Sequence, residues 1–143
     1  MDPGIYILLL SGDGGEYKIG SRGMITFQPG YYCYVGSALG PGGLSRVARH
    51  IRVASSRDRP PRWHIDHLLM NPAFRLIRVY CAHTTERLEC SLAGALILPV
   101  INGFGSSDCS CEGHLFFSPQ DPEDAIIAAF HTITLNLVVR ELR

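Results

Sequence analysis

The sequence predicts one α/β domain over residues 1–143. Short apolar runs with β-branched and aromatic members alternate with segments of helical periodicity, and turn residues separate them. With 143 residues, 46% hydrophobic and 18% charged, the chain is long enough to bury one core and leaves little room for two. No internal repeat or linker marks a second domain.

The first half of the chain alternates strands with one clear helix. Gly4–Leu10 is an apolar run that ends in a Ser-Gly-Asp-Gly-Gly turn, so it predicts a buried strand. Glu16–Gly20 and Met24–Phe27 predict a small hairpin, and Tyr31–Val35 predicts a second core strand. Leu44–Ala54 carries apolar residues at i, i+3, i+4 and i+7, which is typical of an amphipathic helix.

The second half predicts two more strands and three helices. The strands are Phe74–Cys81 and His114–Phe117, and a loop rich in Gly, Ser and Cys occupies Asn102–Gly113. The helices are Trp63–Leu69, a helix from the N-cap candidates Thr84 and Thr85 to about Leu98, and a helix beginning at Asp121-Pro122-Glu123. Ile133–Val139 fits either a continuation of that helix or a strand.

Charge is balanced over the chain but segregated along it. Thirteen basic residues match thirteen acidic ones, so net charge draws the chain to neither nucleic acid nor membrane. Six arginines fall between Arg46 and Arg62, whereas Ser106–Asp124 carries five acids and no Lys or Arg. Because guanidinium groups bind phosphate oxygens in a bidentate manner, the basic segment fits a phosphodiester backbone. A solvated helix face is the alternative.

Membrane and export signals are not predicted. The apolar run Leu92–Ile101 contains Pro99 and is shorter than the roughly 18 residues of a membrane span. Asp2 and Pro3 follow the first Met without a basic region, so we expect no signal peptide. Five cysteines, an odd number, favour buried thiols or a metal site over a disulfide framework. We therefore expect a cytoplasmic protein.

Two aromatic-glycine segments and three polar side chains form the first candidate site. Gly4-Ile5-Tyr6 begins one predicted strand, and Tyr34-Val35-Gly36 ends another. Arg46 and His50 lie at i and i+4 of the helix that follows, so their side chains share one face. Glu89 lies near the start of a later helix. If the two strands pair, phenols, a guanidinium and a carboxylate meet in one place.

These segments, in this order, resemble the GIY-YIG nuclease superfamily. The resemblance covers about residues 4–117 and is strongest to the Uri-like branch, a domain of unknown function found in archaea and some bacteria. It implies a small mixed sheet flanked by helices (an α+β fold) and metal-dependent hydrolysis of DNA phosphodiester bonds. The flanking segments that carry it are Gly30-Tyr31-Tyr32, Ser37-Ala38, Arg49-His50, Trp63-His64-Ile65-Asp66 and Ser107-Asp108-Cys109.

The resemblance also implies roles for individual residues. Tyr6 is the candidate general base, with Tyr34 near it. A phenol has a pKa of about 10, so it would need a neighbouring cation such as Arg46 or His50 to act near neutral pH. Arg46 would hold the scissile phosphate, and His50 stands where the family usually has Tyr or His.

A metal ion belongs to the same expectation. Glu89 would hold Mg²⁺ or Mn²⁺, which prefer oxygen ligands and stabilise the leaving oxygen. Asn102 is the candidate for an asparagine that the family carries downstream of its Glu. The predicted partner is DNA. The sequence leaves open whether that DNA is branched or damaged and whether a protein partner supplies targeting.

Further residues are candidates for contact with the nucleic acid. Arg49, Arg52 and Arg62 carry positive charge near the site, and Trp63 and His64 offer rings that stack on bases. The alternative for this segment is a helix that packs Trp63 on the core and pairs Asp66 with an arginine.

Cysteines and histidines suggest two possible zinc sites. Cys90, Cys109, Cys111 and His114 could close a structural tetrahedral Zn²⁺ site, although the pattern favours reduced thiols packed beside the candidate site. His64, Asp66 and His67 resemble the end of a dinuclear metallohydrolase motif, which makes a zinc-dependent hydrolase one rival function. A second rival is a nucleic-acid-binding module that keeps the scaffold without catalysis.

Overall fold

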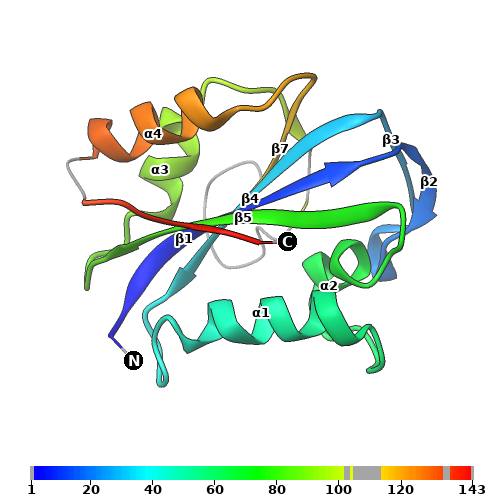
Figure 1. Cartoon of the computed structure of the whole chain (residues 1–143), viewed down its shortest axis with the longest axis horizontal. Helices are drawn as coiled ribbons and strands as arrows, with labels where there is room; N and C mark the ends of the chain where they lie inside the picture. The colour runs from blue at the N-terminus through cyan, green and yellow to red at the C-terminus, as the bar shows by residue number, and fades with distance from the viewer. Residues whose placement is uncertain (1, 102–103, 105–113, 134–135, 143) are drawn as a thin grey trace.

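The computed structural model describes residues 2–101, 104, 114–133 and 136–142 (Figure 1). Its main sheet has six strands in the order β6-β7-β4-β1-β5-β8, and a separate two-stranded ribbon is formed by β2 and β3. The strands are β1 (Gly4–Gly12), β2 (Gly15–Lys18), β3 (Met24–Phe27), β4 (Gly30–Ala38), β5 (Phe74–His83), β6 (Val100–Ile101), β7 (Leu115–Ser118) and β8 (Val138–Glu141).

The helices form one layer on each face of this sheet. Figure 1 shows α1 and α2 together on one side and α3 and α4 on the other. The helices are α1 (Ser45–Ser56), α2 (His64–Leu69), α3 (Glu89–Ala95) and α4 (Glu123–Thr132). The predicted α+β class with flanking helices is confirmed. The pairings among the described strands are all antiparallel, which differs from the mixed sheet that the resemblance implied.

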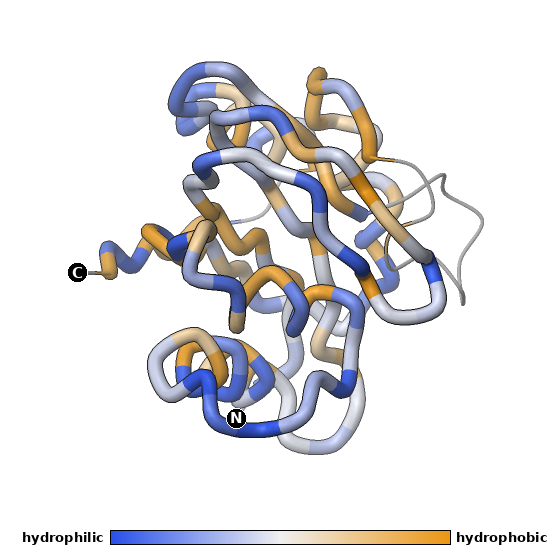
Figure 2. Tube along the Cα trace, turned by 90° about the vertical axis from the view of Figure 1, so that its right-hand side faces the viewer, coloured by the Kyte–Doolittle hydropathy of each residue, from blue (hydrophilic) through white to orange (hydrophobic). Residues whose placement is uncertain are grey.

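The central strand β1 is buried on both faces, which explains its uninterrupted apolar sequence. Tyr6, Leu8 and Leu10 pack towards α1 and α2, whereas Ile5, Ile7 and Leu9 pack towards α3 and α4. Successive side chains of a strand point to opposite faces, so one strand supplies both cores. In Figure 2, where α1 is seen nearly end-on at the bottom, its turns mix hydrophobic and hydrophilic residues, as an amphipathic helix requires.

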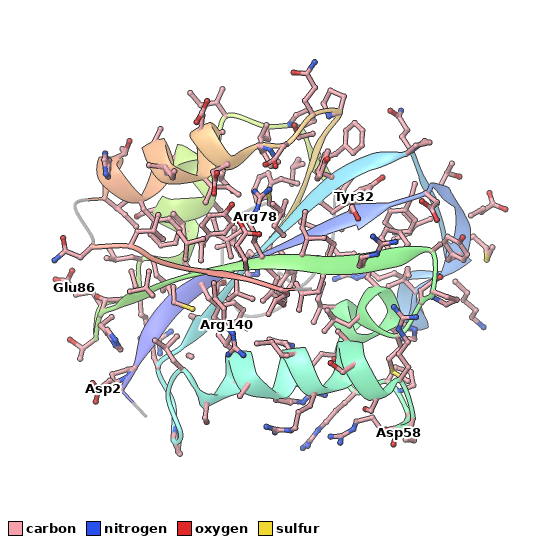
Figure 3. All side chains as sticks on the ribbon, in the orientation of Figure 1. Asp2, Tyr32, Asp58, Arg78, Glu86 and Arg140 are labelled. Atoms are coloured by element: carbon pink, nitrogen blue, oxygen red, sulfur yellow. The ribbon has the colours of Figure 1, made fainter. Side chains whose placement is uncertain are left out.

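The end of the chain forms a strand. Val138–Glu141 pairs with β5 as the edge strand β8, which decides between the helix and the strand predicted for this segment. Arg78 on β5, labelled in Figure 3, contacts Glu141 of β8 and also Asp121 and Glu123 at the start of α4. This charge cluster joins the sheet edge to the helix layer.

The helix α3 begins later and ends earlier than predicted. Thr84 does not cap it, because the Thr84 hydroxyl accepts a hydrogen bond from the Glu86 amide at 3.1 Å in a turn before the helix. The helix then begins at Glu89 and ends at Ala95. No helix in the described part of the chain has the length and apolar character of a membrane span.

Candidate active site

The pairing of β1 with β4 places the two aromatic-glycine segments side by side. Tyr6 lies opposite Gly36 in the register, and Leu8 lies opposite Tyr34. The ring of Tyr6 lies across Gly36, where a Cβ atom would come within 2.4 Å of the Tyr6 Cζ atom. Gly36 is therefore required by the close approach of the phenol. Gly4 is required in the same way, since a Cβ there would lie 2.4 Å from the carbonyl oxygen of Ala82.

Residues from the two paired strands and from the neighbouring helices line one cavity of about 290 Å³. It includes four of the five residues predicted to be catalytic: Tyr6, Tyr34, Arg46 and Glu89. His50, the fifth, lies behind Tyr6 and contacts it directly. The remaining lining residues are Gly36, Ser37, Arg62, Trp63, His64 and His114. Residues far apart in sequence thus converge on one pocket.

Tyr6 and His50 form a buried pair. The Tyr6 hydroxyl and His50 Nε2 share a hydrogen bond of 2.9 Å. Both side chains are almost fully buried, at 2% and 1% exposure. Burial raises the pKa of the Tyr6 phenol well above its usual range, Tyr34 and Glu89 add to the rise, and Arg46 opposes it. In the unliganded protein Tyr6 is therefore a neutral phenol.

His50 does not supply the positive charge that the sequence suggested. Burial lowers the pKa of His50 to about 4, and the neighbouring cation Arg49 contributes to that decrease. The imidazole is consequently neutral near pH 7. Its Nδ1 atom is buried and has no hydrogen-bond partner among the described residues. Arg46 is the cation that favours the phenolate of Tyr6.

Arg46 lies at the first turn of α1 with its side chain exposed to solvent. Its Nη1 donates a hydrogen bond of 2.9 Å to the carbonyl oxygen of Ser37, the residue after Gly36. The guanidinium carbon lies 5.1 Å from the centre of the Trp63 ring, within cation–π range. These two contacts orient the guanidinium, and one hydrogen bond leaves most of its five N–H donors for a ligand.

Glu89 is the first residue of α3 and is held by a histidine. His114 Nε2 lies 2.8 Å from Glu89 Oε2, and the Glu89 side chain is 16% exposed. The described residues contain no group of three metal-ligating side chains. Mg²⁺ nevertheless fits this site, because it is commonly bound by one or two carboxylates, several waters and the phosphate of the substrate.

Trp63 is positioned by Arg49 and Asp66. Asp66 accepts two hydrogen bonds from the Arg49 guanidinium, at 2.9 and 2.7 Å, and two more from the amides of Arg62 and Trp63. Arg49 in turn lies 3.9 Å from the centre of the Trp63 ring. Burial by itself would raise the pKa of Asp66, but these hydrogen bonds outweigh burial and lower it.

The expected pairing of Asp66 with an arginine is confirmed, and it bears on two other hypotheses. Both carboxylate oxygens of Asp66 are occupied by Arg49 and by amides, so Asp66 does not form a metal site with His64 and His67. Arg49 is likewise committed to Asp66 and Trp63 rather than to solvent. Among the other residues proposed to contact nucleic acid, Arg52 and Arg62 are exposed, and Arg62 and His64 line the cavity.

The structure describes only part of the predicted cysteine cluster. Cys90 is disulfide-bonded, which differs from the reduced thiol expected, and His114 contacts Glu89. Cys109, Cys111 and Asn102 lie outside the described residues. A disulfide sulfur is not the thiolate that zinc requires, so Cys90 does not serve as a zinc ligand in this structure, and the remaining ligands of the predicted zinc site stay a prediction.

Sequence reasoning missed two functional contacts. It did not foresee that the carbonyl of Ser37 orients Arg46, although Ser37 directly follows the second aromatic-glycine segment. It also does not predict the contact of His114, a possible zinc ligand by sequence, with Glu89. No local pattern signals that pair, because strand packing brings the two residues together.

Fold and site together define an α+β protein with a polar cavity where its two central strands meet helices from both layers. The chain belongs to the family described as Domain of unknown function DUF123, whose model matches residues 5–135. No curated protein and no solved structure matches the chain.

Proposed function

We propose that this chain is a metal-dependent endonuclease of the GIY-YIG type that hydrolyses DNA phosphodiester bonds. The observation that carries the proposal is the convergence of Tyr6, Tyr34, Arg46 and Glu89 on one cavity. Two phenols, a guanidinium and a carboxylate are the groups needed for proton transfer, phosphate binding and cation binding.

Arg46 is suited to bind the scissile phosphate. Its guanidinium is exposed at the mouth of the cavity and is oriented by the Ser37 carbonyl and the Trp63 ring. A preorientated guanidinium binds phosphate oxygens through two parallel hydrogen bonds and stabilises the negative charge that grows on them during hydrolysis.

Tyr6 is suited to move a proton. Hydrolysis adds the oxygen of water to phosphorus, breaks the bond to one ester oxygen, and transfers one proton from the water to that leaving oxygen. With its hydrogen on Nε2, neutral His50 donates to the Tyr6 oxygen and favours the phenolate, as Arg46 does. The negative charge of Glu89 opposes ionisation of Tyr6, so neutralising that carboxylate also favours the phenolate.

Glu89 is the residue that would hold Mg²⁺ or Mn²⁺. Its Oε2 atom is fixed by His114, so the carboxylate faces the cavity in a defined orientation. Bound there, the cation would supply positive charge to the leaving oxygen.

Nicking of supercoiled plasmid tests the proposal. With Mg²⁺ or Mn²⁺ the protein should convert the plasmid to open circles, and a chelator should abolish the reaction. Arg46→Ala should reduce the rate at least about 100-fold, since it removes the phosphate ligand. Arg75→Ala, which removes an exposed arginine outside the cavity, is the matched control and should leave the rate unchanged. Equal nicking by Arg46→Ala would identify a contaminating enzyme and contradict the proposal.

A nucleic-acid-binding module without catalysis is the second candidate. The observation that favours it is the neutral Tyr6–His50 pair, since burial raises the pKa of Tyr6 and leaves no strong base in the unliganded cavity. Such a module would bind DNA with Arg46 and Arg62 and would not nick it under any divalent cation.

A further inference from the structure

A second depression adjoins the candidate active site. It has a volume of about 240 Å³ and shares Ser37, Arg46 and Glu89 with the cavity described above. Arg46 and Glu89 therefore form the wall between the two depressions. On its far side the second depression is lined by Leu39, Gly40, Arg87 and Cys90.

Arg87 is the additional positive charge in this depression. It lies in the turn before α3, where the Glu86 amide donates to Thr84 and the Leu88 amide donates to the Glu86 carbonyl. The side chain is exposed and forms no hydrogen bond or ion pair with another described residue. The turn thus presents Arg87 at the rim of the depression with its donors available.

A third depression also adjoins the candidate active site. Pro41, Arg49, Arg52 and Trp63 line it, and it shares Arg46 and Trp63 with the central cavity. The second and third depressions have only Arg46 in common, so the three depressions adjoin one another around Arg46. Each of the three depressions has an arginine besides Arg46 in its lining, which suits binding of successive phosphates.

We propose that Arg87 and the depression beside Glu89 bind the phosphate next to the scissile one on the cleaved strand. This inference rests on the proposed function, because it takes Arg46 as the ligand of the scissile phosphate. The Glu89 carboxylate in the shared wall would repel a phosphate if it were unpaired. Its contact with His114, and the cation that it is proposed to hold, offset that repulsion.

The test measures binding and cleavage of single-stranded and duplex oligonucleotides by the full chain. Arg87→Ala should weaken binding roughly fivefold and reduce the slope of log affinity against log salt by about 0.7–0.9. Arg75→Ala is the matched control and should change neither quantity. An unchanged slope for Arg87→Ala would overturn the proposal.

A neutral methylphosphonate, moved one phosphate at a time along the oligonucleotide, locates the contact. At one position beside the cleaved bond, the methylphosphonate should weaken DNA binding by the wild-type protein. At that same position it should leave DNA binding by Arg87→Ala unchanged, because that variant has already lost the contact. The same penalty in both proteins at every position would overturn the proposal.

Binding and cleavage separate this proposal from the proposed function. If the wild type shows the methylphosphonate pattern at one phosphate but never nicks DNA, Arg87 stands as the ligand of a DNA phosphate, while the nuclease proposal fails. If the wild type nicks DNA and Arg87→Ala binds and cleaves as the wild type does, the phosphate site is wrong and the nuclease proposal stands. A wild type that neither binds nor nicks DNA would overturn both.

Discussion

At the scale of single residues, His50 is the group whose burial has the clearest thermodynamic consequence. The imidazole is 1% exposed, and its pKa in the folded protein is about 4. In an unfolded chain a histidine has a pKa of about 6.5. Between these two values the unfolded chain binds a proton that the folded protein does not bind, so lowering the pH favours unfolding.

The free energy of unfolding should therefore decrease as the pH falls from about 6.5 to about 4. The decrease attributable to His50 should be on the order of 3 kcal/mol. Urea denaturation at several pH values measures it. His50→Gln should have a smaller decrease over this window, whereas His131→Gln, at an exposed histidine, should behave as the wild type. Asp66 has a lowered pKa and contributes only at lower pH. An equal decrease in His50→Gln would contradict this explanation.

At the scale of elements, the short helix α2 depends on Asp66. Its carboxylate accepts hydrogen bonds from the backbone amides of Arg62 and Trp63 and forms an ion pair with Arg49 of α1. Six residues are too few to form a stable helix alone, so these contacts and the packing of its apolar side chains hold α2 in place. The same contacts fix Trp63 at the wall of the cavity.

Asp66→Asn should lower the free energy of unfolding by about 3 kcal/mol, because it breaks a buried ion pair and leaves the Arg49 charge without its partner. Trp63 is the only tryptophan, so its fluorescence reports on the same site. Its emission should shift to longer wavelength in Asp66→Asn as the ring loses its ordered contacts. Asp58→Asn, at an exposed loop position, is the control. Unchanged stability and emission in Asp66→Asn would show that this carboxylate does not hold α2.

At the scale of the whole molecule, the main features of the fold follow from local patterns. The apolar run of β1, the aromatic-glycine segment in β4 and the amphipathic repeat of α1 each predicted the element that forms. The pairing of β1 with β4 is expected because the two segments are close in sequence. This pairing is enough to place Tyr6 beside Tyr34 and Gly36.

What could not be predicted depends on contacts between distant segments. The position of β8 beside β5 is supported by the contact of Glu141 with Arg78. The β-branched pattern of the segment does not indicate which strand it pairs with. The neutral state of His50 follows from its burial beneath Tyr6, which a helical repeat does not reveal. The pairing of His114 with Glu89 likewise depends on the packed sheet.

The central claim is that one cavity combines a proton-transfer phenol with a cation-binding carboxylate. Single-turnover cleavage of a DNA oligonucleotide, measured together with its binding, tests this most directly. Tyr6→Phe and Glu89→Gln should each slow cleavage by at least about 100-fold and leave DNA affinity within about threefold of the wild type. Cleavage by both variants at the wild-type rate would contradict the claim.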